Sequence, residues 1–184
     1  MQAPDFWNSR GFISLLLLPA SWCYSLGGYL RQAMNTPVKV NVPVICVGNL
    51  SAGGSGKTPI TLSLAEELTG MDFTPHIISR GYGGSESGPT LVEPEKHTAK
   101  QVGDEPLMMA KRFPVWVSKD RAEGAKAAIQ NGADIILLDD GFQNPSLHKD
   151  LSLIVLDNKI GLSNRRVIPA GPLRESIATG LKRA

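Results

Sequence analysis

The chain of 184 residues is long enough for one domain with a substantial core, and its 42% hydrophobic and 20% charged residues exclude a disordered protein. Its 19 Lys and Arg residues against 17 Asp and Glu give a formal net charge of +2, too small to predict a nucleic-acid partner. Cys23 and Cys46 have neither metal-site nor disulfide-framework spacing, so a reducing compartment is expected.

Residues 1–34 differ in character from the rest of the chain. Phe12–Leu18 is apolar, and aromatic and aliphatic residues continue as far as Arg31. Pro19 and several Ser and Gly residues interrupt this run, which makes it a poor membrane span. Trp and Tyr residues with flanking arginines are instead typical of a helix that lies in the membrane interface. The alternative is a helix packed on the protein's own core.

The strongest signal is the succession of a strand, a glycine-rich turn and a helix. The apolar run Val42–Leu50 predicts a buried strand, and Pro59 stands where the first turn of a helix is expected. The helix pattern continues with apolar residues at helical spacing, namely Ile60, Leu64, Ala65 and Leu68. A turn between a strand and a helix is the context in which a glycine loop binds phosphate.

The turn itself reads SAGGSGKT, and its residue types suit a polyphosphate. The glycines let the backbone approach phosphate closely and direct amide groups toward it. Lys57 is placed to reach the β- and γ-phosphates, and the Thr58 hydroxyl to ligate Mg²⁺. The predicted ATP-binding residues are Ser51, Ala52, Gly53, Gly54, Ser55, Gly56, Lys57 and Thr58. Ser51 stands where the usual pattern has Gly, and the alternative is a βα turn that binds nothing.

Two further segments place polar residues after expected strands. Thr74–Arg80 predicts a strand that runs into a flexible Gly-Tyr-Gly-Gly loop, and ligands bind at such strand ends in open α/β sheets. Glu86–Lys100 is expected to be a surface loop. A helix is expected from Val102 to Arg112, with Asp104 as its N-cap; the alternative to a catalytic Asp104 is this capping role alone.

The second strong signal is an apolar strand within Ala133–Asp140 that ends in Asp139 and Asp140. An aspartate at this position holds Mg²⁺ in P-loop enzymes, whereas the alternative is a turn or N-cap aspartate. Strands are also expected at Pro114–Ser118 and Leu151–Asp157, with a helix at Arg121–Asn131 between the first of these and Ala133. Strands that alternate with helices predict an α/β fold, a P-loop NTPase-like parallel sheet with helices on both faces.

Five motifs in this order, SAGGSGKTP, SRGYGG, GDEP, DDGFQN and PAGPLRE, closely resemble the tetraacyldisaccharide 4′-kinase (lipid A 4′-kinase) family. The resemblance runs from the leucine-rich N-terminus to about Glu175. It implies transfer of the ATP γ-phosphate to the 4′-hydroxyl of a tetraacylated glucosamine disaccharide at the cytoplasmic face of the bacterial inner membrane. The implied partners are this lipid substrate and the membrane surface, with no nucleic acid and no protein partner.

The resemblance also implies roles for single residues. Asp104 matches the catalytic aspartate that activates the sugar hydroxyl, and Asp139 and Asp140 match paired acids near Mg²⁺; Lys57 joins them as a catalytic residue. Residues in motifs that line the same cleft are expected to bind the acceptor, namely Arg80, Gln143, Arg174 and Glu175. The domain division expected from these motifs is a membrane-associating segment at 1–34 and a P-loop kinase domain at 35–184.

Two departures from the family pattern leave alternatives open. Asn144 stands where the family often has His, and the family's further C-terminal domain is absent from this sequence. A P-loop fragment that binds nucleotide without catalysis is therefore one alternative, and the chain as given is expected to bind MgATP but to phosphorylate lipid poorly. The other is a GTPase, although Gly161 stands where the guanine-reading Asn-Lys-x-Asp motif needs Asp. The three histidines, His76, His97 and His148, are expected to be surface or packing residues.

Overall fold

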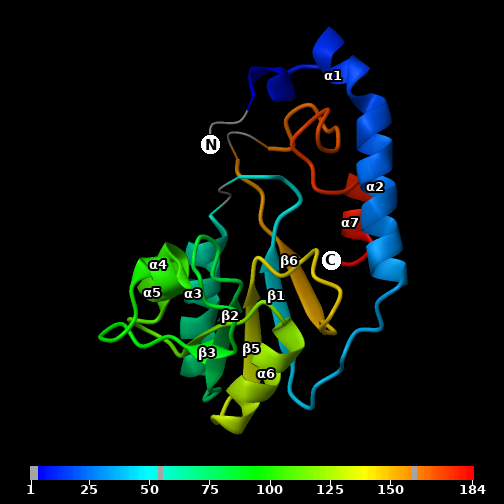
Figure 1. Ribbon diagram of the computed structural model, residues 1–184. Coiled ribbons are helices and arrows are strands. Elements are labelled where there is room, and N and C mark those ends of the chain that lie inside the picture. The colour runs from blue at the N-terminus through cyan, green and yellow to red at the C-terminus, as the bar shows by residue number, and fades with distance from the viewer. Residues whose placement is uncertain (1–3, 54–55, 159–160) are drawn as a thin grey trace. The chain divides into compact units, whose positions relative to one another are not determined.

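The structure is a computed structural model that describes residues 4–53, 56–158 and 161–184 (Figure 1). Contacts between Cα atoms divide the chain into two compact units. The first unit contains Met1–Asn35, Asn49–Gly56 and Ile154–Ala184, and the second contains Thr36–Gly48 and Lys57–Leu153. The expected division at residue 34 stays a prediction.

The second unit is built on a six-stranded, mostly parallel sheet with strand order β3-β4-β2-β5-β1-β6. The strands are β1 (Val44–Gly48), β2 (Pro75–Ser79), β3 (Thr90–Leu91), β4 (Val115–Val117), β5 (Ile135–Asp139) and β6 (Leu151–Ile154). β1 and β2 both pair with β5 in parallel, and β2 pairs with β4 in parallel; β3 pairs with β4 antiparallel. The predicted α/β class with a largely parallel sheet is confirmed.

Helices of the second unit cover both faces of this sheet. Alternate strand residues such as Ile77 and Leu137 form one buried cluster with Ala65, which belongs to α3 (Lys57–Gly70), and Met109, which ends α5 (Asp104–Met109). The opposite face is covered by α6 (Arg121–Gln130), whose Gly124 lies so close to Ile78 that a Cβ there would meet Ile78 Cγ2 at 3.2 Å. This alternation is what a strand buried on both faces requires.

Several local expectations are wrong in detail. Asp104 is the first residue of α5 and not its N-cap, which is Gly103 and has no side chain. The expected loop 86–100 contains β3 and the start of α4 (Ala99–Val102), which a capping box between Thr98 and Gln101 begins. The C-terminal region, for which no helix or strand is predicted above, contains α7 (Ile177–Leu181).

The first unit contains the N-terminal helices, a 3₁₀ helix η1 (Asp5–Asn8), α1 (Phe12–Leu16) and α2 (Leu18–Ala33). Pro19 lies in the first turn of α2, where its missing N–H is tolerated, so it begins this helix rather than interrupting it. Ser14 donates a hydrogen bond to the carbonyl of Ala170 (2.5 Å), and Ser21 to that of Val167 (2.7 Å). One side of the helical segment is thus packed within the unit.

Large apolar side chains of these helices are nevertheless exposed. They are Phe12, Ile13, Leu15, Leu16, Trp22, Tyr24, Leu26, Tyr29, Leu30 and Met34. No helix in the described ranges combines the length and the apolar character that crossing a bilayer requires. The N-terminal segment therefore has features of both expected alternatives, a packed side and an exposed apolar side.

Candidate functional site

The polar residues of the second unit gather at the carboxyl edge of the sheet. Because β1, β2, β4 and β5 are parallel, their carboxyl ends lie at one edge, and pairing sets Asp139 opposite Val47. The next residue, Asp140, donates its backbone N–H to the Val47 carbonyl (3.0 Å). Arg80 follows β2 at the same edge. The fold thus brings together candidate residues from sequence-distant motifs.

The first turns of α3 contribute a cation and a hydroxyl next to the two aspartates. Lys57 Nζ lies 3.7 Å from Asp140 Oδ1, with the Lys57 side chain 10% and the Asp140 side chain 35% exposed. Thr61 donates from its hydroxyl to Asp139 Oδ1 (3.4 Å), and Thr58 is buried on the same helix face. The ion pair between Lys57 and Asp140 joins the GKT and DDG motifs.

The surroundings of Asp139 disfavour the ionised form of its carboxyl group. Its side chain is 1% exposed, and burial raises its pKa from 3.8 to about 7; the charges of Glu105 and Asp140 act in the same direction. Lys57 and the Thr61 hydrogen bond lower this pKa but do not compensate. Such a cluster favours the binding of an additional cation.

The oxygen donors at this edge suit Mg²⁺. Two carboxylates and the Thr58 hydroxyl are hard ligands, and Mg²⁺ in nucleotide sites uses one or two carboxylates plus substrate phosphates. Among the described residues, no three His, Cys, Asp or Glu side chains are arranged to hold a metal by themselves. The donor set therefore fits a metal that is completed by phosphate oxygens rather than a metal held by protein alone.

The Gly-Tyr-Gly-Gly loop after Arg80 packs against the turn that precedes Asp104. A Cβ on Gly84 would lie 2.4 Å from the Gln101 carbonyl oxygen, and one on Gly103, whose φ is 91°, would lie 2.8 Å from that of Tyr82. Ser85 also donates its N–H to the Lys100 carbonyl (3.0 Å). These glycines permit close packing of two loops, so the expected flexible loop is instead held in place.

Arg121 is a residue of this edge that sequence reasoning missed. Its side chain is 3% exposed and donates from Nη1 to the Ser118 carbonyl (2.5 Å), whereas Nε has no hydrogen-bond partner among the described residues. Burial lowers its pKa, Arg80 lowers it further, and Asp140 and Asp139 raise it. A buried guanidinium thus contributes positive charge near the acidic pair. It follows Asp120, the N-cap of α6, and so looks in sequence like an ordinary first-turn residue.

The DDGFQN motif forms a tight loop after β5. Asp140 has φ 50°, a left-handed conformation that costs a non-glycine residue about 1 kcal/mol. Asn144 donates its N–H to the Gly141 carbonyl (3.0 Å), which closes a turn with Gln143 near its tip. The Asn144 side chain accepts from the Ser146 N–H and hydroxyl (2.9 and 2.8 Å), so this residue stabilises the following bend.

In the first unit the glycine loop is paired with the PAGPLRE motif. Ser51 forms an antiparallel bridge with Leu173, Ala52 donates to the Pro172 carbonyl (2.7 Å), and Arg174 donates to the Leu50 carbonyl (2.7 Å). Gly53 and Gly56 have φ of 126° and 74°, which only glycine adopts readily. Gly54 and Ser55 lie outside the described residues.

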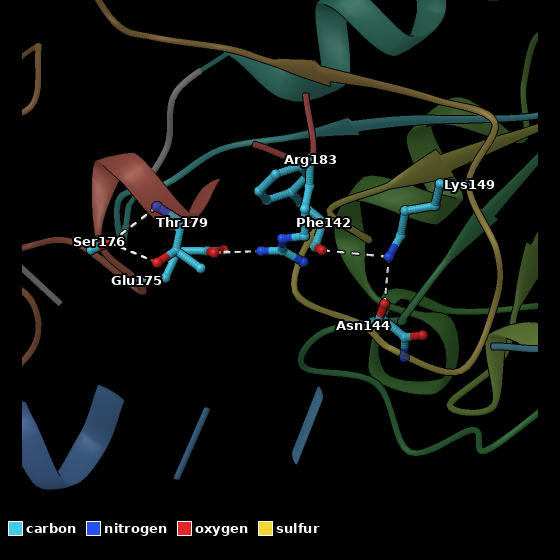
Figure 2. Close-up of polar contacts among 7 residues, drawn as sticks. All are labelled: Phe142, Asn144, Lys149, Glu175, Ser176, Thr179 and Arg183. Atoms are coloured by element: carbon cyan, nitrogen blue, oxygen red, sulfur yellow. Dashed lines mark hydrogen bonds and ion pairs between the residues drawn. The ribbon is translucent and has the colours of Figure 1, made fainter. Parts of the chain in front are cut away.

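The end of the PAGPLRE motif is tied to α7. Glu175 forms an ion pair with Arg183, and the Ser176 hydroxyl accepts from the Thr179 N–H (3.1 Å) at the start of the helix (Figure 2). Gly180 lies so close to Leu50 that a Cβ at this position would be 2.4 Å from Leu50 Cδ2. Glu175 thus has a local partner that the sequence did not reveal.

The histidines have structural contacts, as expected. His76 is buried in β2 and accepts a hydrogen bond from Trp116 Nε1 (3.1 Å), and burial lowers its pKa. His97 accepts from the Glu93 N–H (2.9 Å), and exposed His148 lies 3.6 Å from Asp150. None of the three contacts a predicted site residue through these bonds.

Comparison with known proteins points to one family. A family model described as tetraacyldisaccharide-1-P 4′-kinase, LpxK, matches residues 13–184. A tetraacyldisaccharide 4′-kinase of Jannaschia sp. is 51% identical over all of this chain and 56% of its own length. That of Rhodopseudomonas palustris is 53% identical over 95% of this chain and 51% of its own length. The chain spans about half the length of the curated relatives it matches.

A solved structure agrees with the fold. The crystal structure of LpxK from Aquifex aeolicus, described as an "apo" form in complex with ATP, superposes with a TM-score of 0.80 at 35% identity. The match covers 94% of this chain and 57% of that protein. The described fold is therefore that of part of an LpxK structure.

Proposed function

The chain belongs to the tetraacyldisaccharide-1-phosphate 4′-kinase family, and we propose on that premise that it carries the nucleotide-binding machinery of this kinase. The reaction is transfer of the ATP γ-phosphate to the 4′-hydroxyl of a tetraacylated glucosamine disaccharide 1-phosphate, which gives lipid IVA. The observation that carries this proposal is the ion pair between Lys57 and Asp140 (3.7 Å), which joins the two motifs that phosphoryl transfer requires.

In this proposal the segment from Ser51 to Thr58 is a P-loop. Gly53 and Gly56 have positive φ and so allow backbone amides to converge on phosphate, and Lys57 adds a charge that reaches the β- and γ-phosphates. Thr58, Asp139 and Asp140 would hold Mg²⁺, which when bound neutralises the charge that develops on the phosphoryl oxygens. The crowded negative charge around Asp139 supports this metal site.

Asp104 is proposed as the base that accepts the proton of the sugar hydroxyl. The N-cap of α5 is Gly103, so Asp104 does not occupy the capping position of this helix. Its neighbour Glu105 contributes to the charge that raises the pKa of Asp139, so the helix start lies close to the acidic pair. A carboxylate beside the phosphoryl group is suited to general-base catalysis.

The acceptor is proposed to contact Arg80, Gln143, Arg174 and Glu175, while its acyl chains stay in the membrane. The exposed apolar residues of α1 and α2 support contact with a membrane surface. Charge supports it too, because the first unit has eight Lys and Arg against three Asp and Glu, a formal +5, whereas the second unit has eleven against fourteen, a formal −3. A basic unit with exposed apolar side chains fits the anionic cytoplasmic face of the bacterial inner membrane.

Two assays test the proposal. A fluorescent ATP analogue is titrated with and without Mg²⁺ into the chain and its Lys57→Ala variant, and transfer of labelled phosphate to the disaccharide lipid is measured with the complete gene product. We expect Mg²⁺-dependent binding that Lys57→Ala abolishes, with ATP competing and GTP not competing. Binding that survives Lys57→Ala refutes the P-loop assignment, competition by GTP favours the GTPase alternative, and binding without transfer by the complete gene product favours a non-catalytic module.

A further inference from the structure

The loop that carries Asp140 and Gln143 is fixed at several points in the second unit. Phe142 is fully buried and packs on the end of β1, where a Cβ on Gly48 would lie 2.4 Å from the Phe142 Cβ. The far end of the loop is held by Val38, which donates to the Ser146 carbonyl (2.8 Å) and accepts from the His148 N–H (2.8 Å). Between these anchors lies the turn of residues 141–144.

Lys149 closes this loop from within. Its Nζ donates to the Phe142 carbonyl (3.4 Å) and to the Asn144 carbonyl, so one ammonium group holds the carbonyls of the residues before and after Gln143 (Figure 2). The side chain is only partly exposed. Burial raises the pKa of the Cys46 thiol to about 12 and the Lys149 charge acts in the opposite direction, which agrees with an ammonium directed toward β1.

These contacts explain a need for a cation at this position. The turn follows Asp140, which is held at φ 50°, and residues 141–144 lie outside the strands of the sheet. Hydrogen bonds from a charged donor are stronger than those from a neutral donor. A single long side chain can thus fix the orientation of a turn that a regular ladder does not support.

We propose that Lys149 is a positioning residue, which sets the place of the Gln143 side chain at the acceptor side of the phosphoryl-transfer site by holding the carbonyls that flank it. The inference rests on the proposed function for what Gln143 does, but not for the contact itself. Lys149 touches neither nucleotide nor acceptor in this proposal, and its effect passes through the turn.

The test uses the complete gene product with Lys149→Met, which removes the donors at similar length, and Lys149→Arg, which restores them. The matched control is Lys126→Met, which removes an exposed lysine paired with Glu123 on α6. The first readout is hydrogen–deuterium exchange of the peptide that contains residues 141–144, which requires no activity. We expect faster exchange in Lys149→Met, recovery in Lys149→Arg, and no change in Lys126→Met.

The second readout is phosphoryl transfer in a double-mutant cycle. We expect Lys149→Met to reduce kcat/KM for the acceptor by on the order of 10- to 100-fold, the usual effect of a misplaced group, with binding of metal-free ATP unchanged. Gln143→Ala should give a similar loss, and the double variant should be no worse than either single variant.

The outcomes separate this inference from the proposed function. Unchanged exchange in Lys149→Met overturns the inference whether or not the protein is a kinase, and additive losses in the cycle overturn the route through Gln143. A third outcome is faster exchange in Lys149→Met while the wild-type protein transfers no phosphate to the lipid. That outcome supports the Lys149 contact but rejects the proposed function. Loss of exchange protection over the whole chain in Lys149→Met, not recovered by arginine, shows a folding role and also overturns the inference.

Discussion

Replacement of Asp139 by asparagine is expected to stabilise the metal-free protein while it removes Mg²⁺-dependent nucleotide binding. Burial, Glu105 and Asp140 raise the pKa of Asp139 from 3.8 to about 7. A carboxyl group whose pKa is raised on folding costs nothing below about pH 3, where both states are protonated, and destabilises the native state increasingly up to about pH 7. The asparagine side chain in Asp139→Asn would keep a similar shape, and its carbonyl oxygen can still accept from Thr61.

The size of the effect follows from the same values. A pKa of about 7 in place of 3.8 corresponds to about 4 kcal/mol of destabilisation once the group is fully ionised. Most of this develops with pH, and the free energy of unfolding of the wild type should fall, relative to Asp139→Asn, by about 2–3 kcal/mol between about pH 5 and about pH 8. Denaturant unfolding at these two pH values in the presence of EDTA measures the difference.

The matched control is Asp72→Asn, which removes an exposed carboxylate from a residue whose positive φ of 65° asparagine tolerates. Its stability relative to wild type should not change with pH in the same way. Parallel pH profiles for wild type and Asp139→Asn would refute the reasoning, because they would mean that the Asp139 carboxylate is not costly in the metal-free protein. Retention of Mg²⁺-dependent ATP binding by Asp139→Asn would refute its proposed role as a ligand.

Two further predictions concern the acceptor side. The Asp104→Asn variant of the complete gene product should keep its ATP affinity and thermal stability, because Asp104 is not the N-cap of α5. Its rate of phosphoryl transfer should fall by at least about 10²-fold. Near-normal turnover would contradict the assignment of Asp104 as the base. One face of α2 carries three exposed apolar side chains, Trp22, Leu26 and Leu30, which are 68%, 58% and 47% exposed. Their simultaneous replacement by serine should weaken binding to anionic vesicles by at least about tenfold without lowering the melting temperature. A lower melting temperature with unchanged vesicle binding would show that this face packs on protein.

Much of the fold was predictable because local signals and burial agree. The apolar runs that end in Gly48 and Asp139 have the length and composition of buried parallel strands, and both form strands at the expected positions. The exceptions lie where polar side chains take buried positions that apolar residues were expected to fill. In α3 the buried face begins with Thr58 and Thr61, whereas Ile60 is 40% exposed, and the Thr61 hydroxyl donates to Asp139 at the edge of the sheet.

Only the motif residues of the candidate site were predictable. Lys57, Asp139 and Asp140 belong to patterns with a known mechanism, and the fold brings them together. No short sequence pattern marks three further residues, Glu105, Arg121 and Lys149. Their surroundings and contacts depend on tertiary structure. The same reason explains the error at Asp104, where composition suggested a cap but Gly103 supplies the required backbone conformation, with φ 91°.

Several locally destabilising features lie at one edge of the sheet. Asp140 is held at a left-handed φ, Asp139 is buried with a costly charge, and Arg121 is buried with an Nε that lacks a partner in the described part of the chain. Each of these features destabilises the metal-free protein, and folds retain such features mainly where a ligand or reaction uses them. The distribution of strain and charge therefore indicates the same site as the motifs, and it does so independently of family membership. Lys57 does not fully offset the effects that raise the pKa of Asp139, and in the proposed function a nucleotide-bound divalent cation would supply further positive charge.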